Sequence, residues 1–114
     1  LKECGKFVKE QLHLPFVQIY GDENKIIEKL AVCTGSGKSL MKQVLKKGVQ
    51  AYVTGDMDYH SSIDAVAQGI CIIDAGHYGT EYIFMDYMEK ELKRMLPDLE
   101  TEKMQISYPC KIIE

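Results

Sequence analysis

The sequence predicts an α/β fold in which helices pack on the faces of a largely parallel or mixed sheet. Short apolar runs that indicate strands alternate with segments whose apolar residues recur at helical spacing. Gly48 and Gly69 follow two of the helical segments, where glycine commonly ends a helix. Because strand, helix and strand follow one another repeatedly, we expect βαβ crossovers and hence parallel neighbouring strands.

The expected elements begin with a helix over residues 1–11, and Leu14-Pro15 ends that pattern. The run at 29–34 is apolar in its middle, as in a strand buried on both faces. The full set comprises helices at 1–11, 40–47, 61–68 and 78–96, strands at 16–20, 29–34, 50–54, 70–74 and 103–107, and a tail at 109–114 that is a candidate edge strand.

Length and composition indicate one α/β domain over residues 1–114. Hydrophobic residues make up 46% and charged residues 27%, as in soluble globular domains. No run approaches the roughly 18 apolar residues of a membrane span, and we expect no signal peptide and a cytoplasmic protein without membrane contact. A net charge of -3 with scattered Lys and Arg excludes a basic stripe for nucleic acid. The chain opens on Leu1 with a helix already under way, and we expect it to belong to a longer protein.

The four cysteines predict free thiols. They are Cys4, Cys33, Cys71 and Cys110, far apart and without a C-x-x-C pair. Structural zinc sites usually contain such close pairs, and disulfides are rare in a reducing cytoplasm. We therefore expect neither a cysteine zinc site nor a disulfide.

Residues 34–39, Thr-Gly-Ser-Gly-Lys-Ser, join a strand to a helix as a phosphate loop does. A phosphate loop requires G-x-x-x-x-G-K-[ST], which places its first glycine at position 32, and that residue is Val32. Two glycines at a helix start still expose backbone N–H groups that an anion favours. A tight turn is the main interpretation, and nucleotide triphosphate binding is the lesser alternative.

Asp56, Asp58 and His60 follow the strand at 50–54 with the spacing of a metal-binding carboxylate loop. One of the aspartates is equally suited to capping the next helix. His60 has no evident structural role, and a histidine at a polar strand end is a candidate for proton transfer.

His77 and Glu81 are the strongest candidate pair. They follow the strand at 70–74 and lie four residues apart, so a helix that begins near Tyr78 directs both side chains to one side. Metal ligation is one interpretation, and stabilisation of the helix's first turn by hydrogen bond and dipole is the other. Two ligands are too few for a catalytic metal, so further ligands would have to come from elsewhere.

Three motifs in order carry a family resemblance: residues 32–37 (Val-Cys-Thr-Gly-Ser-Gly), residues 54–60 with Thr-Gly-Asp and Tyr-His, and residues 74–81 (Asp-Ala-Gly-His-Tyr-Gly-Thr-Glu). The chain resembles the C-terminal half of the NGG-interacting-factor-three-like family. Members form toroidal hexamers with a dinuclear metal centre and are often described as GTP cyclohydrolase I type 2 homologues. The resemblance extends from Leu1 to about Ser107.

This resemblance implies a site for two divalent ions of zinc, iron or manganese, in which His77 and Glu81 are ligands and His60 is a nearby acid or base. The family's other ligands, a histidine pair and an aspartate, come from an N-terminal half that this sequence does not contain, so metal would bind this chain alone weakly. In a metal-dependent hydrolase of this kind, a hydroxide bridging the ions would attack an electrophilic carbon or phosphorus atom. The alternative is a non-catalytic metal-binding scaffold whose homo-oligomer, a hexamer by resemblance, is the function. No motif identifies a small-molecule substrate.

Overall fold

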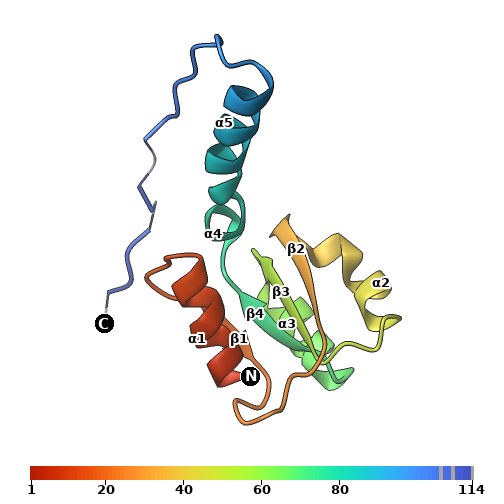
Figure 1. The fold of residues 1–114 in the computed structure, drawn as a ribbon. Coiled ribbons are helices and arrows are strands. Elements are labelled where there is room, and N and C mark those ends of the chain that lie inside the picture. The colour runs from red at the N-terminus through yellow and green to blue at the C-terminus, as the bar shows by residue number, and fades with distance from the viewer. Residues whose placement is uncertain (106, 109, 114) are drawn as a thin grey trace.

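A four-stranded mixed sheet forms the centre of the computed structural model, which describes residues 1–105, 107–108 and 110–113 (Figure 1). Its spatial order is β1-β4-β3-β2, and strands β2, β3 and β4 are parallel while β1 runs antiparallel to β4. The strands are β1 (Gln18–Tyr20), β2 (Leu30–Ser36), β3 (Ala51–Gly55) and β4 (Cys71–Asp74). The expected α/β fold with a largely parallel or mixed sheet is confirmed.

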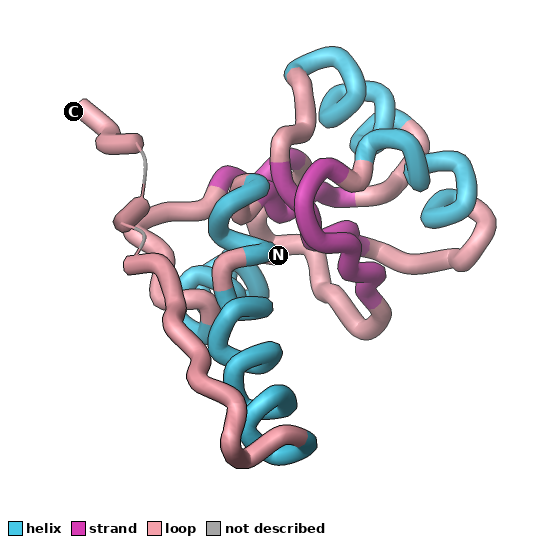
Figure 2. The backbone as a smooth tube through the Cα atoms, turned by 90° about the horizontal axis from the view of Figure 1, so that it is seen from above, coloured by secondary structure: helices cyan, strands magenta, loops and turns pink. Residues whose placement is uncertain are grey.

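Helices cover both faces of this sheet. Figure 2 shows the strands between α2 and α3 on one side and α1 on the other. Helices α2 and α3 are the crossovers that the parallel strand order requires. The helices are α1 (Lys2–Gln11), η1 (Lys38–Leu40), α2 (Met41–Leu45), α3 (Tyr59–Ala67), α4 (His77–Glu81) and α5 (Ile83–Met95).

The core consists of two apolar layers, one on each face of the central strands β3 and β4. Tyr52 and Ile72 belong to the layer under α2 and α3, and Val53 and Ile73 belong to the layer under α1. Alternation of side chains along a strand explains why neighbours enter different layers. Because β2, β3 and β4 are parallel, their carboxyl ends meet at one edge of the sheet.

Strand β2 differs from the expectation that it is buried on both faces. Leu30 is 39% exposed and Val32 is 65% exposed, whereas Ala31 and Cys33 pack partly against the core. The prediction was wrong because β2 lies at the edge of the sheet, and α1 packs over β1 and β4 on the far side. Apolar content alone does not distinguish a central strand from an edge strand.

The helix expected at 78–96 begins one residue earlier and is interrupted at Tyr82, which separates α4 from α5. The strand expected at 103–107 is also wrong for its described residues 103–105 and 107. Lys103 instead pairs with Asp86 and Glu89 of α5, so the chain returns along that helix (Figure 1). In the tail, residues 110–113 form no strand, and Pro109 and Glu114 lie outside the described residues.

Among the described residues, no helix is both long and apolar enough to cross a membrane. All four cysteines are free thiols. Of the two in apolar strand runs, which are expected to be buried, Cys71 is buried, whereas Cys33 on the edge strand β2 is only half-buried.

Candidate metal centre

The ends of β3 and β4 are held unusually close, and this contact sets the geometry of the site. A Cβ atom added at Gly55 would overlap the Gly76 carbonyl and lie 2.5 Å from the backbone nitrogen of His77. Only glycine permits this approach. The loop after β3 is therefore pressed directly against the start of α4.

Asp74 fastens the same two loops together. This carboxylate is only 8% exposed and accepts hydrogen bonds from Met57 N at 2.7 Å and Gly76 N at 2.8 Å. A buried carboxylate with two backbone donors is well satisfied. It therefore acts as a rigid brace between the two strand ends and is not available as a ligand.

His77 is the first residue of α4, and both of its ring nitrogens face a carboxylate. Nδ1 lies 3.0 Å from Asp56 Oδ2, and Nε2 lies 3.1 Å from Glu81 Oε2. All three side chains are about half exposed. The helical spacing thus brings His77 and Glu81 into contact as the sequence indicated.

The electrostatics of this cluster favour positive charge. The hydrogen bond to Asp56 raises the pKa of His77, and the charge of Glu81 raises it further. An ionised carboxylate only accepts hydrogen bonds, so Nδ1 donates to Asp56. In the neutral ring, the lone pair of Nε2 then faces Glu81, and a proton or a metal cation between the two would relieve their repulsion.

Gly35 at the end of β2 keeps the space beside these donors clear. A Cβ atom there would overlap Glu81 Oε1 and lie 3.2 Å from His77 Nε2, and the residue has a φ of +66°. Its backbone N–H donates to Thr80 Oγ1 at 2.8 Å, which joins β2 to α4. The site is thus bounded by the ends of all three parallel strands.

The donor set suits a divalent ion but supplies only part of a site. An imidazole nitrogen beside a carboxylate oxygen is a combination that binds zinc, iron and manganese. Within the described part of the chain, however, no group of three or more His, Cys, Asp or Glu side chains could hold a metal ion. His77 and Glu81 therefore fit half of a metal centre.

The two candidate aspartates after β3 have different roles. Asp58 caps α3 by accepting from Ser61 N at 3.0 Å, and its ion pair with Lys38 lowers its pKa. Asp56 instead contacts His77, and the sequence did not indicate that contact. One feature of the sequence could have revealed this contact: a βαβ crossover places the ends of the strands at 50–54 and 70–74 side by side.

His60 occupies the first turn of α3 and is exposed, with its ring edge-on to Tyr59 at a centroid distance of 5.4 Å. In the described part of the chain, no hydrogen bond joins His60 to His77 or Glu81. The role of His60 as an acid or base stays a prediction.

The polar groups of the glycine-containing loop after β2 form hydrogen bonds and an ion pair within the protein. Gly37 N donates to Thr54 Oγ1 at 2.9 Å, and Tyr52 donates its hydroxyl to Gly37 O at 3.0 Å. With Gly35 N bonded to Thr80 and Lys38 paired with Asp58, these groups are engaged within the protein. This geometry favours the tight-turn interpretation over a phosphate loop.

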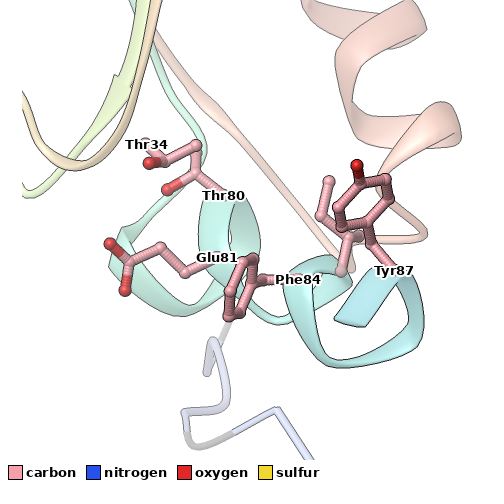
Figure 3. Close-up of a pocket in the computed structure, with 6 residues that line it drawn as sticks. Thr34, Thr80, Glu81, Phe84 and Tyr87 are labelled. Atoms are coloured by element: carbon pink, nitrogen blue, oxygen red, sulfur yellow. The ribbon is translucent and has the colours of Figure 1, made fainter. Parts of the chain in front are cut away.

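A cleft of about 580 Å³ lies beside the candidate site, and Glu81 is one of its lining residues. Figure 3 shows Thr34 and Thr80 above Glu81, and the ring of Phe84 between Glu81 and Tyr87. The candidate metal ligand therefore forms part of a wall of a partly aromatic cleft.

The fold and the site together define an α/β protein that gathers histidine and acidic side chains at the carboxyl ends of parallel strands. The chain belongs to the Duf34/NIF3 (NGG1p interacting factor 3) family, whose model matches residues 1–109. This result confirms the family that the motif order indicated.

Individual relatives agree with this membership. The chain is 38% identical over 112 residues to a GTP cyclohydrolase 1 type 2 homolog of Clostridium acetobutylicum, covering 98% of this chain and 40% of that protein. A hypothetical protein of Staphylococcus aureus superimposes with a TM-score of 0.83 at 26% identity, over 99% of this chain and 39% of that one. A Bacillus cereus protein related to NIF3 also gives 0.83 at 26% identity, over 99% of this chain and 32% of that one. The chain thus spans well under half of the length of these relatives.

Proposed function

We propose that this chain contributes one side of a divalent metal centre, through His77 Nε2 and Glu81, to a metal-dependent hydrolase like the GTP cyclohydrolase I type 2 homologues. The observation that carries the proposal is the 3.1 Å contact between an imidazole nitrogen and a carboxylate oxygen, two atom types suited to metal ligation, beside Gly35, where a side chain would fill the space. The name shared by the curated relatives supports the reaction class.

The proposal includes two ions of zinc, iron or manganese, with the remaining ligands outside the described residues. When bound, such ions polarise water and substrate oxygens. Of the chain's own groups, Glu81 and the Nε2 atom of His77 hold the metal, and His60 is the candidate proton carrier.

The cleft beside Glu81 is the substrate site in this proposal. Phe84 and Tyr87 offer aromatic faces on which a purine ring can stack, and the exposed Thr34 offers a hydroxyl group. A guanine nucleotide matches this combination of apolar and polar walls.

The test compares Glu81→Ala with the unchanged protein in the complete gene product, after loading with zinc, manganese or iron. We expect less metal per chain and at least about 100-fold less turnover of GTP, because a lost ligand weakens both binding and activation. Glu28→Ala, which removes an exposed carboxylate remote from the site, is the matched control. Equal metal content and equal turnover in Glu81→Ala would overturn the proposal.

A non-catalytic scaffold is the second candidate, because α5 exposes apolar side chains suited to assembly. Ile83 is 44% exposed, Phe84 60% and Tyr87 62%. In this alternative the metals hold a homo-oligomer together, with a hexamer as the family expectation. Chelation should then dissociate the assembly, whereas intact assembly with loss of a measurable turnover would exclude the scaffold.

A further inference from the structure

Asp56 has a left-handed backbone conformation in the loop that follows β3. Its φ is +54°, in the left-handed region that side chains other than glycine, asparagine and aspartate rarely adopt. The helix cap that this loop needs is provided two residues later by Asp58. A residue other than glycine with a positive φ that does not cap the helix draws attention to the contacts of its side chain.

The strained backbone directs the carboxylate of Asp56 to His77 by two contacts. Oδ2 lies 3.0 Å from Nδ1 of the ring, and Oδ1 accepts from the backbone N–H of His77 at 3.3 Å. These residues are 21 positions apart in the sequence. The contact exists because Gly55 and the Asp74 brace hold the two strand ends together.

The position of Asp56 excludes it from the half-site formed by His77 and Glu81. Asp56 lies on the Nδ1 side of the imidazole ring, whereas Glu81 lies on the Nε2 side. A carboxylate that accepts from the far nitrogen of a ligating histidine fixes the ring's orientation and keeps the hydrogen on that nitrogen. It also makes the metal-facing nitrogen a stronger donor.

We infer that Asp56 is the positioning residue of the metal centre, holding His77 so that Nε2 is presented as a bare nitrogen towards the cation. This inference rests on the proposed function for the metal itself. The orientation of the ring and the placement of its hydrogen are properties of the chain and do not require the metal.

The decisive variant is Asp56→Gly, because glycine adopts a φ of +54° without strain and lacks the carboxylate. The complete gene product is titrated with Zn²⁺ against a chromophoric chelator, and its urea midpoint is measured in parallel. We expect a Kd for Zn²⁺ weaker by about 10- to 100-fold, with a cooperative urea transition that shows the variant is folded. An unchanged Kd would overturn the inference.

Asp56→Asn provides the conservative comparison. Asparagine tolerates the left-handed backbone and can accept from Nδ1, but it is neutral, so the expected Kd lies between those of the unchanged protein and Asp56→Gly. If Asp56→Gly fails to fold, Asp56→Asn decides: a severalfold weaker Kd supports the inference, and an unchanged Kd overturns it. The absorption spectrum of bound Co²⁺ should shift in the same order, because it reports ligand geometry.

A metal-free measurement separates this inference from the proposed function. The ¹⁵N chemical shifts of the neutral His77 ring should show the hydrogen on Nδ1 in the unchanged protein and a shift towards Nε2 in Asp56→Gly. If His77→Ala and Glu81→Ala leave the Kd for Zn²⁺ unchanged, the proposed function fails, while the ring shifts still test the contact. The same ring shifts in the unchanged protein and Asp56→Gly would overturn the positioning role.

Discussion

The centre of the sheet and helix α5 are both rich in apolar residues, but they differ sharply in burial. Every residue of β3 and β4 is buried, and Ile72 and Ile73 are inaccessible to solvent. Helix α5 has no buried residue, and Phe84 on it is 60% exposed. Strands β3 and β4 lie between two layers of helices, whereas the described contacts of α5 come mainly from the returning segment around Lys103.

The candidate metal centre lies where these two regions meet. His77 is fixed by the ends of β3 and β4, and Glu81 ends the short helix that leads into α5. The rigid region therefore sets the position of the site, and the exposed region forms the wall of the adjoining cleft. Four substitutions test this difference between the sheet centre and α5.

The largest effect is expected from Ile72→Ala in the centre of β4. The side chain is fully buried, and its removal leaves a cavity between tightly packed neighbours. We expect the free energy of unfolding to fall by about 3–4 kcal/mol, measured by urea denaturation. A loss below about 1 kcal/mol would show that this layer is loosely packed.

Gly55→Ala tests the close approach of the two strand ends. The new methyl group would overlap the Gly76 carbonyl, so the loops must separate. We expect a loss of about 2 kcal/mol together with weaker Zn²⁺ binding, because the contact between Asp56 and His77 depends on this approach. Gly48→Ala is the control, because a methyl group added there contacts no neighbouring atom. The φ of Gly48 is +61°, so this control includes some local backbone strain.

Tyr52→Phe tests the connection between the sheet core and the loop after β2. Burial raises the pKa of Tyr52 to about 12, and its hydroxyl donates to Gly37 O. Because the folded-state pKa lies above the unfolded value of about 10, this stabilisation is fully present below pH about 10 and is lost as the pH rises towards about 12.

We expect Tyr52→Phe to cost about 1 kcal/mol at neutral pH through the lost hydrogen bond. The variant should also lose less stability than the unchanged protein between pH 10 and 12. Urea midpoints at neutral and alkaline pH measure both effects. If both proteins lose the same stability between pH 10 and 12, Tyr52 does not titrate in this range.

The smallest effect is expected from Phe84→Ala on α5. This ring is exposed and lies outside both core layers, so we expect a change below about 0.5 kcal/mol in the free energy of unfolding. Its loss should instead weaken GTP binding if the aromatic wall of the cleft holds the base. A stability loss comparable to that of Ile72→Ala would contradict the contrast between the two regions.

Most secondary structure was predictable because it depends on neighbours along the chain. The spacing of apolar residues and the positions of turn residues indicated the four strands of the sheet and the crossover helices. The sequence also limited the cap of α3 to Asp56 or Asp58. The helix after β4 was predicted as continuous, yet it is interrupted at Tyr82. The strand expected at 103–107 was wrong for its described residues, where Lys103 pairs with Asp86 and Glu89 of α5.

The sequence by itself determined the order of strands and helices, the family, and the contact between His77 and Glu81, because four residues make about one helical turn. Only the tertiary structure decided that β2 lies at an edge, that Gly35 keeps the space beside the donors clear, and that Asp56 contacts His77. These features depend on which strands become neighbours, and contacts between residues 21 positions apart leave no periodic signal in a single sequence.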